Sequence, residues 1–184
     1  MSKKILECVY SNEEFQILKY KPSLTQLFYI DMEPMTLKRR IRFMVDYMYG
    51  YSVYYLKKCE GGSEIIGYCT VTSGKNPRFW FAQSDDIIIG PYYVNPKERG
   101  KGYATKMVDA VVNRSKLEWK TGYVVIRNNN PSSIYVTQNV GGKFLFYVHN
   151  TKTKRLIKNP NGECGIYLMQ NKSIAGKNEE GAFV

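Results

Sequence analysis

The feature that most constrains this chain is a strand, glycine-rich turn, helix and strand between residues 87 and 126. Two apolar runs, "IIIGPYYV" and "GYVVIR", enclose the sequence "NPKERGKGYATKMVDAVV". Near-continuous apolar runs are typical of strands buried on both faces. The apolar residues between them recur at helical spacing, namely Ala104, Met107, Val108, Val111 and Val112. The stretch therefore predicts two parallel strands joined by a right-handed crossover helix.

The first of these strands is interrupted by Gly90 and Pro91. Proline has no backbone donor, so inside a strand it indicates a bulge or an unpaired edge. We therefore expect the strand to change its pairing near residue 90.

The rest of the chain supplies more strands and three further helical segments. We expect an opening strand at 3–10, a short helix at 11–20 capped by Ser11 and Glu14, and a second helix from Pro34 to Gly50. Tyr51–Thr72 reads as a hairpin with a turn near 59–64. A short helix at 130–142 and two strands at 143–151 and 164–170, joined by a polar loop, complete the pattern. The pattern predicts an α/β fold with one mixed sheet.

Length and composition set the broad class. A chain of 184 residues suits one domain, which we place at 1–170 with a polar tail at 171–184. No apolar run approaches the roughly 20 residues that span a bilayer, so we expect no membrane insertion. The four cysteines lie far apart, which disfavours a zinc site or disulfide framework and favours reduced thiols in a cytoplasmic protein. The net charge of +11 predicts acidic partners: nucleic acid, an anionic surface or a polyanionic ligand.

The turn before the central helix has the properties of a phosphate site. A helix start presents N–H groups without intrahelical partners and the positive end of a dipole. Gly100 and Gly102 permit close backbone approach, and Arg99 and Lys101 add positive charge. The turn matches neither a Walker A loop nor a dinucleotide fingerprint. The competing interpretation is a basic, solvated turn at a helix start.

The wider stretch "YVNPKERGKGYATKMV" resembles the acetyl-coenzyme A signature of the GNAT superfamily of N-acetyltransferases. A second motif of that family follows one strand later, and the resemblance covers about residues 87–146. The matching residues are Val94, Pro96, Arg99, Gly102 and Ala104 in the first motif, and Asn130, Ser133 and Gly141 in the second.

The resemblance implies a mostly antiparallel sheet with helices on both faces and a central parallel pair of splayed strands. It also implies acetyl-CoA as cosubstrate and no metal. The strand residues Tyr92, Tyr93 and Val94 would pair with the pantetheine arm, and Asn130 and Ser133 would line the opposite wall. The phosphate contacts would fall on Arg99, Gly100, Lys101, Gly102, Tyr103, Ala104 and Thr105.

The implied reaction is direct attack of an amine on the acetyl group. Tyr92 is our candidate for an oxyanion donor through its backbone N–H. Many family members place an acidic tyrosine where this chain has Thr137, so we consider Tyr147 as the acid, with Tyr135 as a weaker choice. The candidate base is Asp86, which could instead be a solvated strand-flanking acid.

Other titratable residues are weaker candidates. Glu33 and Glu64 are second choices for the base, and His149 and Cys69 read as structural residues.

The acceptor follows only by analogy with the family. We expect a small-molecule amine, such as an amino sugar or nucleotide sugar, near the second helix and its tyrosines, several of which core packing would explain. Arg39, Arg40 and Arg42 could face an acidic acceptor or form an exposed helix face. A peptide amine is the alternative. Two other classes stay open: a coenzyme-binding sensor without turnover, and a nucleic-acid module, although no sequence-specific nucleic-acid motif is present. The protein could be a monomer or homodimer.

Overall fold

The computed structural model describes residues 6–59, 64–115, 119–151 and 155–170. In this part of the chain one sheet has the order β1-β2-β3-β4-β5-β6-β9-β7-β8. Its strands are β1 (Glu7–Ser11), β2 (Phe15–Tyr20), β3 (Tyr51–Lys58), β4 (Ile65–Ser73), β5 (Ile87–Val94), β6 (Thr121–Arg127), β7 (Lys143–Asn150), β8 (Leu156–Lys158) and β9 (Cys164–Gln170). The helices are α1 (Leu37–Met48), α2 (Tyr103–Asn113) and α3 (Pro131–Asn139).

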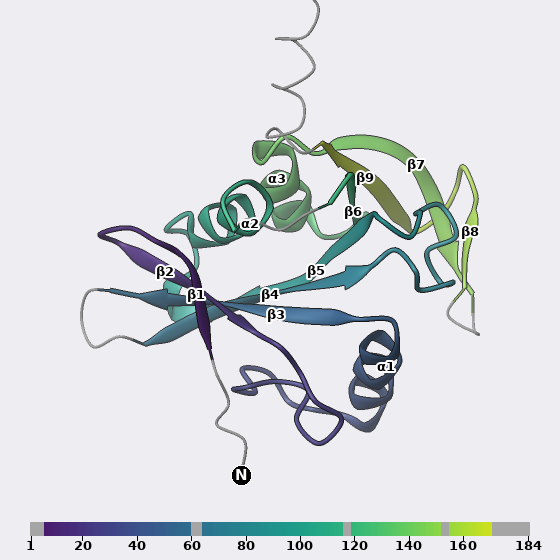
Figure 1. The fold of residues 1–184 in the computed structure, drawn as a ribbon. Helices are drawn as coiled ribbons and strands as arrows, with labels where there is room; N and C mark the ends of the chain where they lie inside the picture. Colours follow the sequence, from purple (N-terminus) through teal and green to yellow (C-terminus); the bar gives the residue numbers. More distant parts are fainter. Residues whose placement is uncertain (1–5, 60–63, 116–118, 152–154, 171–184) are drawn as a thin grey trace, which may run out of the picture.

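The helices cover both faces of the sheet, as predicted. In Figure 1, α2 and α3 lie on one side of the central strands and α1 lies on the other. The core is divided in the same way. Val108 and Val111 of α2 pack in the cluster that contains Ile89 of β5, whereas Phe43 of α1 packs in a separate cluster on the opposite face. The mixed α/β class with helices on both faces is therefore confirmed.

The predicted parallel pair is present, and it is short. β5 pairs in parallel with β6 only from Ile87 to Ile89. The register between β5 and β4 then shifts around Gly90 and Pro91, and Gly90 has a φ of 98°. β4 is otherwise antiparallel to β5 up to Val94. The strand thus keeps one neighbour and leaves the other, which confirms the predicted change of pairing and the splay.

The predicted helix at 11–20 is wrong, because this segment contains the end of β1 and all of β2. The Asn12 side-chain oxygen accepts hydrogen bonds from the backbone N–H groups of Glu14 and Phe15, at 3.1 and 2.8 Å. This contact forms the hairpin turn. Phe15 and Ile17 then bury their side chains in the core beneath α2. Period-two burial against the sheet therefore overrides the local capping pattern.

Helix α1 forms where predicted, with the Thr36 side chain accepting a hydrogen bond from the N–H of Arg39. Its inner side carries Phe43 and Asp46. The apolar residues whose spacing predicted the helix lie on its exposed side: Leu37, Ile41, Met44, Val45 and Met48.

Three other expected segments are a polar loop, the C-terminal tail and a hairpin turn. The polar loop expected before the last strand contains β8, which pairs with the end of β7. The tail at 171–184 and most of the turn at 59–64 lie outside the described residues. Across the described ranges, no helix is long and apolar enough to cross a membrane.

Candidate active site

The turn before α2 presents free backbone donors. Gly102 caps the helix with a φ of 78°, and Gly100 has a φ of 80°. The first helical hydrogen bond runs from the Lys106 N–H to the Gly102 carbonyl, at 3.1 Å. The N–H groups of the first helical turn, from residue 103 to residue 105, consequently have no intrahelical acceptor. A Cβ atom built on either glycine would meet no atom within 4 Å, so this side of the turn is open.

The basic side chains of the turn are engaged with the protein. Arg99 donates through Nε to the Val94 carbonyl at 3.0 Å, and its guanidinium lies 5.4 Å from the centre of the Tyr93 ring. Lys101 pairs with Glu98 at 2.8 Å. Arg99 therefore braces the end of β5, and the outward-facing donors at this helix start are mainly backbone amides.

Beyond residue 89, one edge of β5 faces a gap. The Asn95 N–H donates to the Ile66 carbonyl of β4, at 2.8 Å. Backbone groups of successive residues point to opposite sides of a strand, so the N–H groups of Tyr92 and Val94 point away from β4. They face the side that β6 has left, because β6 pairs with β5 only as far as Ile89.

The side chain of Tyr92 crosses this gap towards α3. Its hydroxyl donates to the Ser133 carbonyl at 2.9 Å. Ser133 belongs to the first turn of α3, whose cap is Asn130: the Asn130 side-chain oxygen accepts from the Ser133 N–H at 3.1 Å. Burial raises the pKa of the Tyr92 phenol, against a smaller lowering effect of hydrogen bonding to Ser133 and Thr137. The phenol is therefore a protonated donor at neutral pH.

A cavity of about 270 Å³ occupies the gap between β5 and β6. It extends from the start of α3 to the face of the sheet that carries α1. Its charged and polar walls come from α1, the loop that follows β4, the ends of β6, β7 and β9, and the start of α3. The lining side chains on these elements include Arg42, Arg78, Arg127, Asn130, Ser133, Asn150 and Cys164, together with Phe79, Leu156 and residues 88–92 of β5.

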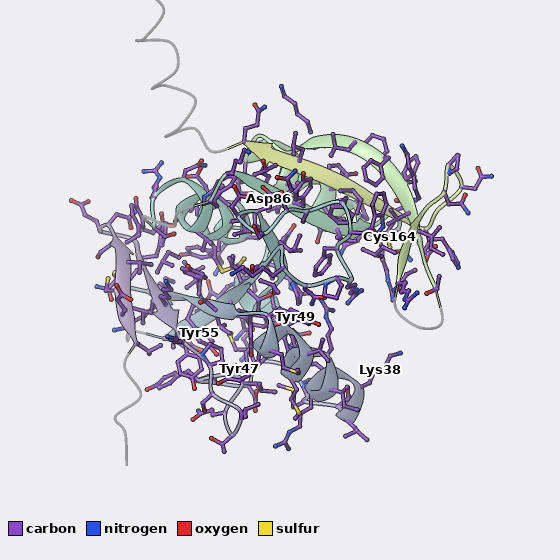
Figure 2. All side chains as sticks on the ribbon, turned by 45° about the vertical axis from the view of Figure 1, so that its right-hand side comes forward. Lys38, Tyr47, Tyr49, Tyr55, Asp86 and Cys164 are labelled. Atoms are coloured by element: carbon purple, nitrogen blue, oxygen red, sulfur yellow. The ribbon has the colours of Figure 1, made fainter. Side chains whose placement is uncertain are left out.

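Asp86, the predicted base, is not brought to this cavity. It is buried, and its carboxylate accepts a hydrogen bond from the Gln83 N–H at 2.8 Å. It lines a separate hollow on β3, β4 and the start of β5. Asp86 lies apart from Cys164 of the cavity wall in Figure 2. The carboxylate thus stabilises the loop before β5 through this hydrogen bond.

The other candidate acids also lie outside the cavity wall. Tyr147 of β7 packs its ring against Phe144 at 4.7 Å and is 40% exposed. Tyr135 is 67% exposed on α3. Thr137 is fully buried, and its hydroxyl lies near the Tyr92 phenol, whose pKa it lowers. Of the four hydroxyls considered, only that of Tyr92 belongs to a residue that lines the gap.

The remaining titratable candidates have structural partners. Glu33 accepts hydrogen bonds from Arg39, at 3.0 Å, and from the Tyr68 hydroxyl. His149 pairs with Glu163 at 2.7 Å on the surface. Burial raises the pKa of the Cys69 thiol to about 12, so this thiol is unreactive. Residue 64 carries the other weak candidate, and it lies next to undescribed residues at the far end of the β3–β4 hairpin.

The expected tyrosine wall is largely core. Tyr51, Tyr54 and Tyr55 are almost completely buried. Tyr47 and Tyr49 lie on and just after α1, as labelled in Figure 2. Phe79, in the loop that follows β4, lines the cavity together with Tyr92.

Sequence reasoning missed two of the three cavity arginines. It singled out Arg42 together with its helical neighbours, but it passed over Arg78 and Arg127. Arg127 ends the strand "GYVVIR", and a charged residue at the carboxyl end of a buried strand is a usable signal. Arg78 sits in a long irregular loop, where no periodicity indicates its direction.

The described residues contain no group of three or more His, Cys, Asp or Glu side chains that could hold a metal ion. They do contain what a long, thin, multiply charged ligand requires. The open helix start suits phosphate oxygens, and the free edge of β5 offers hydrogen bonds to an extended amide-containing arm.

Several solved structures of acetyltransferases have a fold similar to that of this chain. A ribosomal L7/L12 alpha-N-protein acetyltransferase, RimL, in complex with coenzyme A has a TM-score of 0.58 at 10% identity, covering 91% of this chain and 99% of that one. A variant of the spermidine N-acetyltransferase SpeG from Vibrio cholerae has a TM-score of 0.57 at 10% identity, with coverage of 91% and 99%. An acetyltransferase from Thermus thermophilus has a TM-score of 0.52 at 15% identity, with coverage of 76% and 77%.

A comparison with curated protein sequences finds no match. The model of the acetyltransferase (GNAT) family matches residues 22–141, which include the turn before α2, the diverging strands and α3. The chain therefore belongs to the acetyltransferase (GNAT) family and is an acetyl-CoA-dependent N-acetyltransferase.

Proposed function

We propose that the protein transfers an acetyl group from acetyl-CoA to the primary amine of a small molecule, by direct attack in a ternary complex. The observation that carries this proposal is the cavity beside β5, which passes between the splayed strands from the start of α3 to the α1 face. Two reactants can therefore approach one point from opposite sides of the sheet.

The residues present fit the cosubstrate. The amides of residues 103–105 and the open turn at Gly100 and Gly102 would hold its diphosphate. The backbone of residues 92–94 would bind the pantetheine arm along the edge that β6 leaves, with Asn130 and Ser133 on the other wall. When bound, acetyl-CoA supplies an activated thioester.

Tyr92 can serve this reaction with two groups. Its N–H points into the gap, where it can stabilise negative charge on an acyl oxygen, and a fixed backbone dipole needs little reorganisation. Its phenol, held near the start of α3, can donate a hydrogen bond or proton to a departing thiolate. We propose that Tyr92 supplies the acid that Thr137 cannot supply, because an alkyl hydroxyl is a much weaker acid.

The cavity offers no obvious side-chain base. Its described lining residues include no carboxylate and no imidazole. We therefore propose that the acceptor reacts as the neutral amine and that its proton leaves to solvent. A cationic surrounding favours this, since nearby positive charge lowers the pKa of an ammonium group.

The proposal is tested by measuring thiol release from acetyl-CoA with a panel of small primary amines and one N-terminal peptide, and by measuring coenzyme affinity in parallel by calorimetry. Turnover with a small amine and weaker turnover with the peptide would support it. Coenzyme binding without thiol release on any acceptor would favour the sensor alternative, and faster acetylation of the peptide would favour a protein acceptor.

A further inference from the structure

Arg42, Arg78 and Arg127 come from three separate segments and line one cavity. Arg42 lies on α1, Arg78 lies in the loop that follows β4, and Arg127 ends β6. Burial and the Glu163 carboxylate raise the pKa of the Cys164 thiol, and Arg127 and Arg78 lower it, so both guanidinium groups lie near Cys164. Arg42 and Arg78 repel one another, and burial together with this repulsion lowers the pKa of Arg78. The three guanidinium groups thus converge on one region.

The cavity does not neutralise these charges. Among the described residues, Asp46 is the one acid that forms an ion pair with any of the three arginines. Its Oδ2 lies 3.8 Å from Nε of Arg42. Asp46 is itself engaged by the Asn76 side chain at 3.0 Å. Arg78 and Arg127 form no ion pair with a described residue. The described lining residues include three arginines and no carboxylate, so the cavity wall itself carries an excess of positive charge.

Arg78 also has an unmet hydrogen-bonding requirement. Its Nε atom is buried and has no hydrogen-bond partner among the described residues. Its guanidinium lies 5.5 Å from the centre of the Phe79 ring, which fixes its plane but accepts no conventional hydrogen bond. A buried charged donor without an acceptor is strongly unfavourable. An anion bound at the part of this guanidinium that lines the cavity would offset part of this cost electrostatically.

The loop that carries Arg78 is held in place from three sides. Asn76 is tied to α1 through Asp46. Trp80 donates through its indole N–H to the Leu156 carbonyl of β8, at 2.6 Å. Gly74 donates to the Asp86 carbonyl, next to β5, at 2.8 Å. A guanidinium on a braced loop is preorganised for binding and loses little freedom when it captures a ligand.

The location assigns these arginines to the acceptor. The cavity runs beside residues 88–92 of β5. The turn before α2, which would hold the phosphates, begins after the end of that strand at Val94. The coenzyme's diphosphate therefore has its own donors elsewhere. Arg42 and Arg78 stand on the α1 side of the sheet, which is the side opposite to α2.

We propose that the acceptor is a small amine that also carries an anionic group, a carboxylate or a phosphate, and that Arg78 and Arg127 bind this anion with Arg42 at the rim. This inference rests on the proposed acetylation of a small amine. Guanidinium forks match both carboxylate and phosphate oxygens. A polyamine would instead bring several positive charges to a positively charged wall. The side chain of Asn150 also lines this cavity.

The first test compares matched acceptors. The panel contains γ-aminobutyrate and its methyl ester, O-phosphoethanolamine and ethanolamine, and spermidine. We expect kcat/KM for the better anionic amine to exceed that of its neutral partner at least tenfold, and spermidine to be the poorest substrate. The anionic amine with the higher kcat/KM shows whether the arginines prefer a carboxylate or a phosphate. The inference would be overturned if γ-aminobutyrate and its methyl ester react at equal rates and O-phosphoethanolamine and ethanolamine do too. A preference for spermidine would also overturn it.

The second test uses variants. Arg127→Gln and Arg78→Gln should raise KM for the anionic amine at least tenfold, with KM for acetyl-CoA unchanged. Arg155→Gln is the matched control, because Arg155 is exposed and does not line the cavity. Circular dichroism and coenzyme affinity verify that each variant is folded. An equal loss for neutral and anionic amines, or a rise confined to acetyl-CoA, would contradict an acceptor-anion site.

A binding measurement separates this inference from the proposed function. If no amine is acetylated, calorimetry with O-phosphoethanolamine and γ-aminobutyrate still reports on the anion site. If one of these two compounds binds the wild-type protein and Arg127→Gln abolishes that binding, the arginine site is retained although the acetylation proposal fails. Absence of binding by both would remove the site, whatever the result of the thiol assay.

Discussion

In the proposed reaction, Tyr92 would meet two catalytic requirements, because its strand changes neighbours just before this residue. Its backbone belongs to the edge that β6 leaves, and its ring turns to the α3 side, where the hydroxyl meets the Ser133 carbonyl. The side chain can therefore act beside the reacting group that the backbone contacts. In this proposal the Tyr92 phenol takes the role of the acid that the family resemblance leads one to expect at the position of Thr137.

We predict that Tyr92→Phe lowers kcat by about 10²-fold, the lower range for loss of a general acid, and leaves the affinity for acetyl-CoA within about threefold. Burial raises the pKa of this phenol, so the group stays protonated, and the wild-type rate does not fall from its ionisation at any pH below about 10. Stopped-flow thiol release and calorimetry provide the two measurements. Tyr147→Phe is the control and should retain full activity; the opposite pattern would exchange the roles of the two residues.

Asp86 illustrates a carboxylate whose surroundings favour structure over chemistry. Asp86→Asn should keep kcat within about twofold and should leave the pH–rate profile unchanged, because the side chain does not reach the cavity. Asp86→Ala should lower the free energy of unfolding by about 1–3 kcal/mol, since the Gln83 N–H loses its hydrogen bond to a charged acceptor. Urea denaturation measures the second effect. A folded Asp86→Asn protein with a tenfold lower kcat and an altered acid limb would return Asp86 to the role of base.

At the residue scale, backbone-determined sites are far easier to predict than side-chain-determined ones. Gly102 could be placed from sequence, because a helix start that needs a positive φ almost requires glycine. The convergence of Arg78 with Arg127 could not be placed, because it depends on how a loop of irregular structure lies across the sheet. Nothing in the local sequence encodes that position.

At the element scale, the turn before α2 is defined by conformation rather than by crowding. A Cβ at Gly102 would contact no protein atom, yet the φ of 78° disfavours any L-residue by about 1–2 kcal/mol. The same open space is where the diphosphate would approach. Charge and strain can therefore be separated experimentally at this one position.

We predict that Gly102→Glu weakens acetyl-CoA binding at least 100-fold, because a carboxylate would repel the diphosphate, and that Gly102→Ala weakens it less than tenfold. Both variants carry the same backbone strain, so both should show the same loss of stability in thermal unfolding. Calorimetry gives the affinities. Equal losses of affinity for alanine and glutamate would mean that strain alone explains the effect and that the turn is not a phosphate site.

The elements differ in how well sequence predicts them. The strand–helix–strand unit from 87 to 126 was predicted correctly, since buried strands and a wide apolar helix stripe carry strong signals. The segment at 11–20 was wrongly predicted as helix, because Phe15 and Ile17 obtain their burial from α2, far away in sequence. For α1 the periodicity gave the helix but not its orientation: Phe43 faces inward while Ile41 is 54% exposed.

At the scale of the whole molecule, the sheet order and the net charge act together. The order β5-β6-β9-β7 places β9, which follows β7 in the chain, between β6 and β7. This inserts the last strand beside the splayed pair and brings Cys164 and the end of β7 to the cavity. Such an insertion is a long-range choice that periodicity does not reveal. The formal charge of +11 gives the molecule as a whole a positive field.

That positive field leads to a last prediction, on salt. Acetyl-CoA carries several negative charges, so its capture should weaken as ions screen the field: the Debye length falls from about 10 Å at 0.1 M salt to about 3 Å at 1 M. We expect KM for acetyl-CoA to rise about fivefold or more between roughly 0.05 and 0.5 M KCl, with kcat nearly constant because screening weakens capture of the free coenzyme rather than the chemical step. Steady-state kinetics with a neutral amine acceptor isolates the coenzyme term, and KCl avoids the competition that sulfate or phosphate would introduce. A KM that does not change with salt would mean that short-range amide contacts at the turn dominate binding and that the net charge serves another partner.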